Sequence, residues 1–132
     1  MTLTLAQATL LAGILLIALA AFHAALASGA SLGAYAWGGS DDGVLPPRLR
    51  RGSALLTPIV LAMGLVVLVR GGWLYADSAR EMTIPVWCIF VFLVLQVSGA
   101  LRSSSSKERR VMGPLYIVIA ALLAYIGFGN PA

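Results

Sequence analysis

Charged residues are scarce in this sequence. Only 11% of its 132 residues are Asp, Glu, Lys or Arg, whereas 60% are hydrophobic. A typical soluble domain is about half apolar and about one quarter charged, and a single soluble core of this length would not hide such an apolar excess. The composition therefore excludes an ordinary water-soluble fold and predicts that lipid is the solvent for most of the chain.

Cysteine and histidine are almost absent as well. The single cysteine, Cys88, lies inside an apolar run, which excludes an intrachain disulfide and a Cys-x-x-Cys metal site. The single histidine, His23, argues against a haem with two axial ligands from one chain, although a dimer would supply two. We therefore predict no metal and no cofactor.

The net charge of +4 does not indicate nucleic-acid binding, because the basic residues lie in short segments between apolar runs and do not form a basic stripe or tail. We predict no nucleic-acid partner.

Four apolar segments are long enough to cross a bilayer, whose hydrocarbon core of about 30 Å needs about 20 apolar residues in a helix. They predict transmembrane helices at about residues 3–27, 53–69, 82–101 and 111–128. The second segment is the shortest, so we expect Arg51 and Arg70 at its ends to extend toward the lipid headgroups. The first segment lacks the basic n-region of a cleaved signal peptide. The prediction is one all-α domain, an antiparallel four-helix membrane bundle.

Basic residues indicate the orientation of this bundle. Seven of the nine Lys and Arg residues fall in two predicted loops, at about residues 37–52 and 102–110, and only Arg70 and Arg80 fall between the second and third helices. Short loops rich in Lys and Arg stay in the cytoplasm. We therefore expect an inner (plasma) membrane protein with both basic loops in the cytoplasm and both termini outside.

Small residues recur at every fourth position at the end of the first apolar segment. They are Ala21, Ala25, Gly29 and Gly33. Small residues let helix backbones approach closely in lipid, so this row predicts a packing face, either the seam of the bundle or a dimer surface. The seam is the simpler interpretation. We also predict a homodimer, because four short helices enclose little volume.

Polar side chains within the predicted spans are few, and several share one depth in the cytoplasmic half. They are His23, Thr57, Gln96, Ser98 and Tyr116. Intramembrane polar residues are functional candidates, so these five are predicted to line a substrate site or pore. The alternative is that they only form hydrogen bonds between helices. We predict no catalytic residues, since one histidine without an acidic partner is a poor general acid or base.

The two basic loops also suggest ligands. The residues predicted to bind anionic lipid headgroups are Arg48, Arg50, Arg51, Arg109 and Arg110. Asp41 and Asp42, the one acidic pair, offer a weaker possibility of holding a divalent cation.

Three stretches carry a resemblance that covers most of the chain. They read GASLGAYAWGG at 29–39, LPPRLRRGS at 45–53 and SSSSKERRVMGP at 103–114. The chain resembles a family of small bacterial integral membrane proteins with four spans and no known activity, which implies the topology and no mechanism. The small multidrug-resistance exporters have a similar length, but their glutamate in the first helix has no counterpart here.

Two functions are predicted from these observations. The first is a small transporter or channel-like protein built around the polar cluster. The second is a non-catalytic accessory or assembly subunit, which would dock onto a larger membrane complex through the small-residue row.

Overall fold

The computed structural model describes residues 2–39, 41 and 43–129. All regular secondary structure in these residues is helical. The four long helices are α1 (Leu5–Ala27), α2 (Pro47–Arg70), α3 (Thr83–Leu101) and α4 (Gly113–Phe128). All four belong to helical stretches that are long and apolar enough to cross a membrane. The predicted all-α fold with four apolar helices is confirmed.

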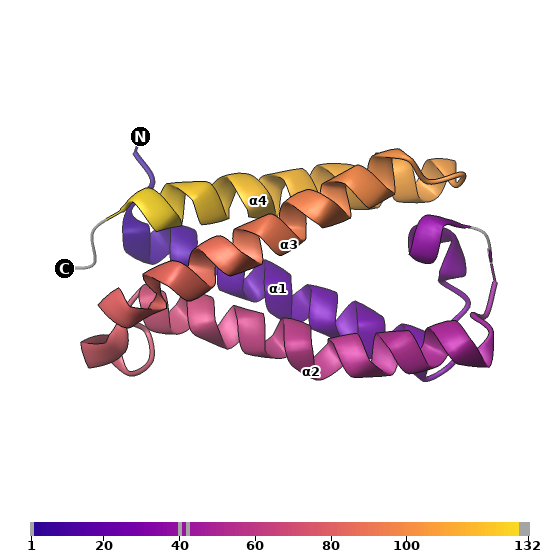
Figure 1. Ribbon diagram of the computed structural model, residues 1–132, viewed down its shortest axis with the longest axis horizontal. Helices are drawn as coiled ribbons and strands as arrows, with labels where there is room; N and C mark the ends of the chain where they lie inside the picture. The colour runs from indigo at the N-terminus through magenta and orange to yellow at the C-terminus, as the bar shows by residue number, and fades with distance from the viewer. Residues whose placement is uncertain (1, 40, 42, 130–132) are drawn as a thin grey trace.

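The helices lie side by side and consecutive ones run in opposite directions (Figure 1). Both chain termini and the α2–α3 connection lie at one end, which we call the terminal end. The α1–α2 and α3–α4 connections lie at the other, the loop end. Helix α1 packs mainly on α2 and α3 mainly on α4, whereas α2 and α3 make few contacts. The bundle is therefore two helix pairs joined chiefly through α1 and α4.

Two glycines bring α1 and α2 together. A Cβ atom on Gly64 would lie 3.3 Å from the carbonyl oxygen of Gly13, and a Cβ on Gly13 would lie 2.8 Å from Leu68 Cδ2. Close packing of this kind stabilises helix pairs in lipid, where no hydrophobic force acts between them. The core continues through fully buried aliphatic side chains, among them Leu16, Val60, Leu93, Ile119 and Leu123.

Helix α2 begins earlier than predicted. It starts at Pro47 instead of near residue 53, with Pro46 as an extended N-cap residue (φ −64°, ψ 158°). Proline suits the first helical position because its missing N–H would have no partner there. Residues 47–52 are thus the first turns of a helix and not part of a loop. Pro58 lies inside α2.

The row of small residues does not form one helix face. Helix α1 ends at Ala27, and Gly29 follows it with a φ of +101°. Gly33 begins a 3₁₀ turn, η1 (Gly33–Tyr35), is buried, and donates its N–H to the Gly43 carbonyl at 2.9 Å. A Cβ at residue 33 would lie 2.1 Å from the carbonyl oxygen of Asp41. Glycine is needed here for a tight loop contact, which explains its presence without a helix interface.

Arg70 does not extend toward headgroups. Its side chain is buried, and its Nη2 group donates to the carbonyl oxygens of Ile126, at 3.0 Å, and Gly129. The Ile126 carbonyl belongs to the last turn of α4 and Gly129 is its C-cap residue, so the guanidinium lies at the negative end of a helix dipole, where a cation is favourable. Within the described part of the chain, the Nε and Nη1 groups of Arg70 have no hydrogen-bond partner. Arg70 therefore joins α2 to the C-terminal end of α4.

The two connections at the loop end are joined to each other. A short turn, η2 (Trp37–Gly39), presents the Gly38 carbonyl to Ser104, which donates both its N–H, at 3.1 Å, and its hydroxyl, at 3.0 Å. The following helix is capped by Ser105, because Ser105 Oγ accepts the Glu108 N–H at 3.4 Å. Its first turn is a π-helical segment, η5 (Glu108–Met112), that leads into α4.

Candidate functional site

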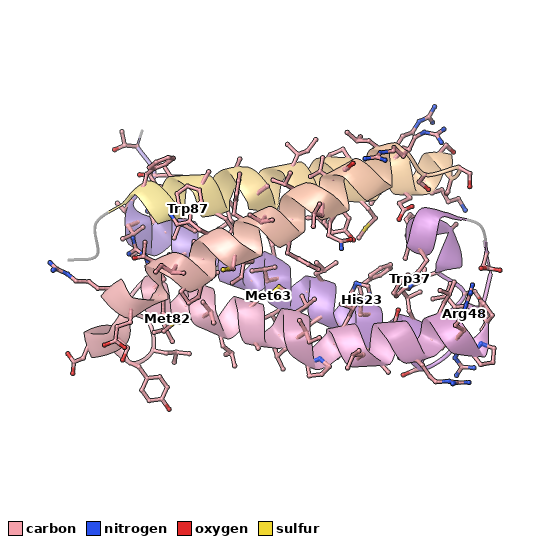
Figure 2. The ribbon with its side chains drawn as sticks, viewed as in Figure 1. His23, Trp37, Arg48, Met63, Met82 and Trp87 are labelled. Carbon is pink, nitrogen blue, oxygen red and sulfur yellow. The ribbon has the colours of Figure 1, made fainter. Side chains whose placement is uncertain are left out.

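A cavity of about 270 Å³ lies at the loop end. Every helix contributes to its wall, and so do η2 and the start of η5. Its polar lining residues are His23, Trp37, Gln96, Glu108 and Tyr116. Figure 2 shows His23 and Trp37 in this half of the molecule, in the space between α2 and the pair formed by α3 and α4. The remaining wall is apolar and includes Leu56, Leu95 and Gly99.

Ser53 connects His23 to Trp37. Its fully buried hydroxyl accepts a hydrogen bond from Trp37 Nε1 at 2.9 Å, and His23 Nδ1 lies 3.3 Å from the same oxygen. The indole N–H can only donate, so the Ser53 proton is free to be donated to His23 Nδ1. We assign the proton of the imidazole ring to Nε2 on this basis. Through these hydrogen bonds, Ser53 on α2 orients the His23 ring and holds the η2 turn next to the cavity.

Trp37 holds an uncommon backbone conformation. Its φ of +55° lies in the left-handed region, which is disfavoured for a bulky side chain. The surroundings hold it there: the ring packs so closely on Gly52 that a Cβ at residue 52 would lie 2.8 Å from Trp37 Cη2. Strained residues and π-helical turns both cluster at functional sites. The strained residue Trp37 and the π-helical segment η5 both flank the cavity.

Glu108 brings a buried carboxylate to the cavity. Its side chain is only 5% exposed, and its Oε1 atom has no hydrogen-bond partner among the residues that the structure describes. The neighbouring cations are directed elsewhere. Lys107 Nζ lies 5.9 Å from the centre of the Tyr35 ring, and Arg109 Nη1 donates to the Ser103 carbonyl at 2.5 Å.

The structure brings together three of the five predicted site residues. His23, Gln96 and Tyr116 line one cavity. Thr57 instead donates its hydroxyl to the Ser53 carbonyl at 2.9 Å, within its own helix. Ser98 accepts a hydrogen bond from the exposed side chain of Arg102. Neither of these two residues lines the cavity.

Sequence reasoning missed three residues of this site. The predicted basic loops included Glu108 and Trp37, and Ser53 was placed at a helix start. Glu108, Met112 and Tyr116 are spaced four residues apart and are all buried, so they share one face of the helix. Following the buried face of the fourth helix backward would have located the carboxylate.

The arginines of the loop end differ in their surroundings. Arg48, Arg51, Arg109 and Arg110 are exposed, as lipid-binding side chains must be. Arg50 is half-buried and donates from Nε to the Ala27 carbonyl at 3.3 Å, so it also caps the end of α1.

The acidic pair offers no support for a metal site. Asp42 lies outside the described residues, and within the described part of the chain no group of three or more His, Cys, Asp or Glu residues is placed to hold a metal ion.

No protein-family model, curated protein or solved structure matches this chain. The family resemblance stays a prediction, and the cavity is the feature of the molecule that points to a function.

Proposed function

We propose that this protein is a small multi-pass membrane transporter or channel-like protein that binds its ligand in the cavity at the loop end. The observation that carries the proposal is the cavity itself, where His23, Gln96, Glu108 and Tyr116 converge from three different helical segments. Polar groups are costly within membrane-spanning bundles, and a concave site with a few convergent polar groups is the usual form of a ligand site.

We further propose that the loop end faces the cytoplasm and that both termini lie outside, in the inner membrane. Seven basic residues support this orientation through the positive-inside rule. Of the two at the terminal end, Arg70 is buried. The exposed arginines of the loop end would then meet the anionic headgroups of the cytoplasmic leaflet.

The orientation is tested by labelling. The exposed free cysteine is first removed by Cys88→Ser, and Ser104→Cys then introduces a thiol on the exposed α3–α4 connection. A membrane-impermeant maleimide is expected to label residue 104 in inside-out vesicles and not in intact cells. Labelling in intact cells would overturn the proposed orientation.

The predicted alternative, an accessory subunit, depended on a helix face that includes Gly29 and Gly33. Both lie beyond the end of α1, and Gly33 is buried in a loop contact. We therefore favour the function that uses the cavity.

Transport is tested in liposomes with two variants of one residue. Gly99 lines the cavity and a Cβ there would meet nothing within 4 Å, so we expect Gly99→Ala to be tolerated and the larger side chain of Gly99→Leu to narrow the cavity. We expect purified protein to move at least one member of a panel of cations, anions and neutral solutes. Gly99→Leu should reduce that flux at least tenfold and Gly99→Ala should preserve it. A panel with no flux above that of protein-free liposomes would contradict the proposal.

A further inference from the structure

We infer that the ligand of this cavity is a small organic cation, with an ammonium group and an apolar part, and that the carboxylate of Glu108 is its counter-ion. This inference rests on the proposed function in that the cavity is the ligand site. It adds the chemical class of the ligand and the residue that selects it.

The first step is the state of Glu108. Burying a carboxylate is costly unless it is hydrogen-bonded or paired with a cation. Glu108 is 95% buried (5% exposed), yet Oε1 has no hydrogen-bond partner. The three cations nearest in sequence, Lys107, Arg109 and Arg110, are all exposed. Glu108 thus lines the cavity with a carboxylate whose Oε1 has no hydrogen-bond partner among the described residues, and a cation bound in the cavity would compensate its charge.

The second step is the rest of the polar lining. Trp37 and Tyr116 contribute aromatic rings, whose faces attract ammonium groups. His23 is held by Ser53 through Nδ1, so one of its two nitrogens is already engaged. Among the described residues of the wall, Glu108 is the only acidic one and none is Lys or Arg. The charge of the wall thus favours a cation over an anion.

An organic cation fits this site better than a metal ion does. Metal sites in proteins use several oxygen, nitrogen or sulfur ligands at short distances. His23 and Glu108 are the only His, Cys, Asp or Glu residues in the wall, and the described residues contain no group of three placed for a metal. An ammonium group needs one carboxylate and an aromatic face, which are present.

The third step is size and access. A volume of about 270 Å³ is just below the range of about 300–1,000 Å³ of drug-sized pockets, so the ligand is small. Lining residues are exposed on two sides: Leu95 (65% exposed) and Gly99 on α3, and Trp37 (37% exposed) and Gly38 at the loop end. The exposed apolar side chain of Leu95 suits a ligand with an apolar part.

The test measures binding to the full-length protein in phosphatidylcholine nanodiscs by titration calorimetry. The probes are 2-phenylethylamine, which is cationic at neutral pH, and 2-phenylethanol, a neutral compound with the same carbon skeleton. We expect wild-type protein to bind the amine at least tenfold more tightly than the alcohol. Glu108→Gln should remove this preference and Glu108→Asp should retain it. Glu81→Gln, which neutralises an exposed carboxylate at the terminal end, is the matched control and should bind as wild type does.

Three results would overturn the inference: no amine binding by wild-type protein, equal binding of amine and alcohol, or an unchanged preference in Glu108→Gln. Because Glu108→Gln is nearly isosteric, its helicity and thermal unfolding are compared with wild type, and Glu108→Asp supplies an independent folded variant. The two proposals fail separately. Amine binding without flux of any solute refutes transport alone, whereas flux of an anion or neutral solute without amine binding refutes the cation site alone.

Discussion

Ser53→Ala is the change that tests the architecture of the cavity most directly. The substitution removes one buried oxygen that serves two partners, Trp37 Nε1 at 2.9 Å and His23 Nδ1 at 3.3 Å. It leaves the shape of the packing almost unchanged, because serine and alanine differ by one atom. The imidazole nitrogen then remains buried without a partner.

The expected cost follows from the two bonds. Hydrogen bonds between helices of membrane proteins contribute about 0.6 kcal/mol on average and at most about 1.7 kcal/mol. The shorter bond, to Trp37, should lie near the middle of this range at about 1 kcal/mol, and the longer one, to His23, near its average. We therefore expect Ser53→Ala to lower the free energy of unfolding by about 1.5–2 kcal/mol.

The assay is a pair of double-mutant cycles in mixed micelles, with unfolding by sodium dodecyl sulfate followed by circular dichroism. Ser53→Ala is combined with Trp37→Phe in one cycle and with His23→Phe in the other, so that a ring is kept at each position. The coupling energy with Trp37 should be the larger. Ser98→Ala is the control, because its hydroxyl is bonded only to the exposed Arg102 side chain. Zero coupling in both cycles, or an equal loss in Ser98→Ala, would refute the network.

Two further predictions concern the packing of the loop and terminal ends. Gly33→Ala should lower the free energy of unfolding by about 1–3 kcal/mol, since its methyl group would meet the backbone of Asp41. The control, Gly43→Ala, places a methyl group that meets nothing within 4 Å and should be nearly neutral. Equal shifts of the two variants in thermal unfolding would contradict this prediction. Arg70→Met should lower the free energy of unfolding by about 1–2 kcal/mol and speed amide hydrogen exchange in the last turn of α4. Arg70→Lys keeps a cation near the carbonyls and should lower the free energy of unfolding by less. Unchanged hydrogen exchange in Arg70→Met would exclude the capping role.

The number and approximate extent of the apolar helices could be predicted from the sequence because hydrocarbon thickness sets their length. The shared depth of His23, Gln96 and Tyr116 followed from the same rule, since antiparallel helices of known length fix depth along the membrane normal. Depth does not fix rotation about a helix axis. Thr57 and Ser98 were therefore included although their side chains form bonds outside the cavity.

Charge misled the prediction at two helix starts. Arg48 and Glu108 were assigned to loops because charged residues interrupt an apolar run, yet both belong to helical segments. On α2, Ser53, Val60 and Val67 are all buried and seven residues apart, so the buried face of the helix includes the serine. This periodicity was a usable signal for the first turns of the helices.

Other features had no local signal. The burial of Arg70 depends on where α4 ends, a tertiary arrangement that the sequence around residue 70 does not contain. The bond between Trp37 and Ser53 depends on the left-handed backbone at Trp37, which residue preferences disfavour. Both features come from contacts made only after the helices have associated.

The exposure of Leu95 and Gly99 at the cavity wall has a consequence for how affinity is measured. A site that a ligand enters past these residues from the acyl chains equilibrates with the ligand dissolved in the membrane and not with the ligand dissolved in buffer. Its apparent dissociation constant, calculated from the aqueous concentration, then varies with the lipid–water partition coefficient of the compound and with the amount of lipid present. Ligands should accordingly be ranked by their mole fraction in the bilayer.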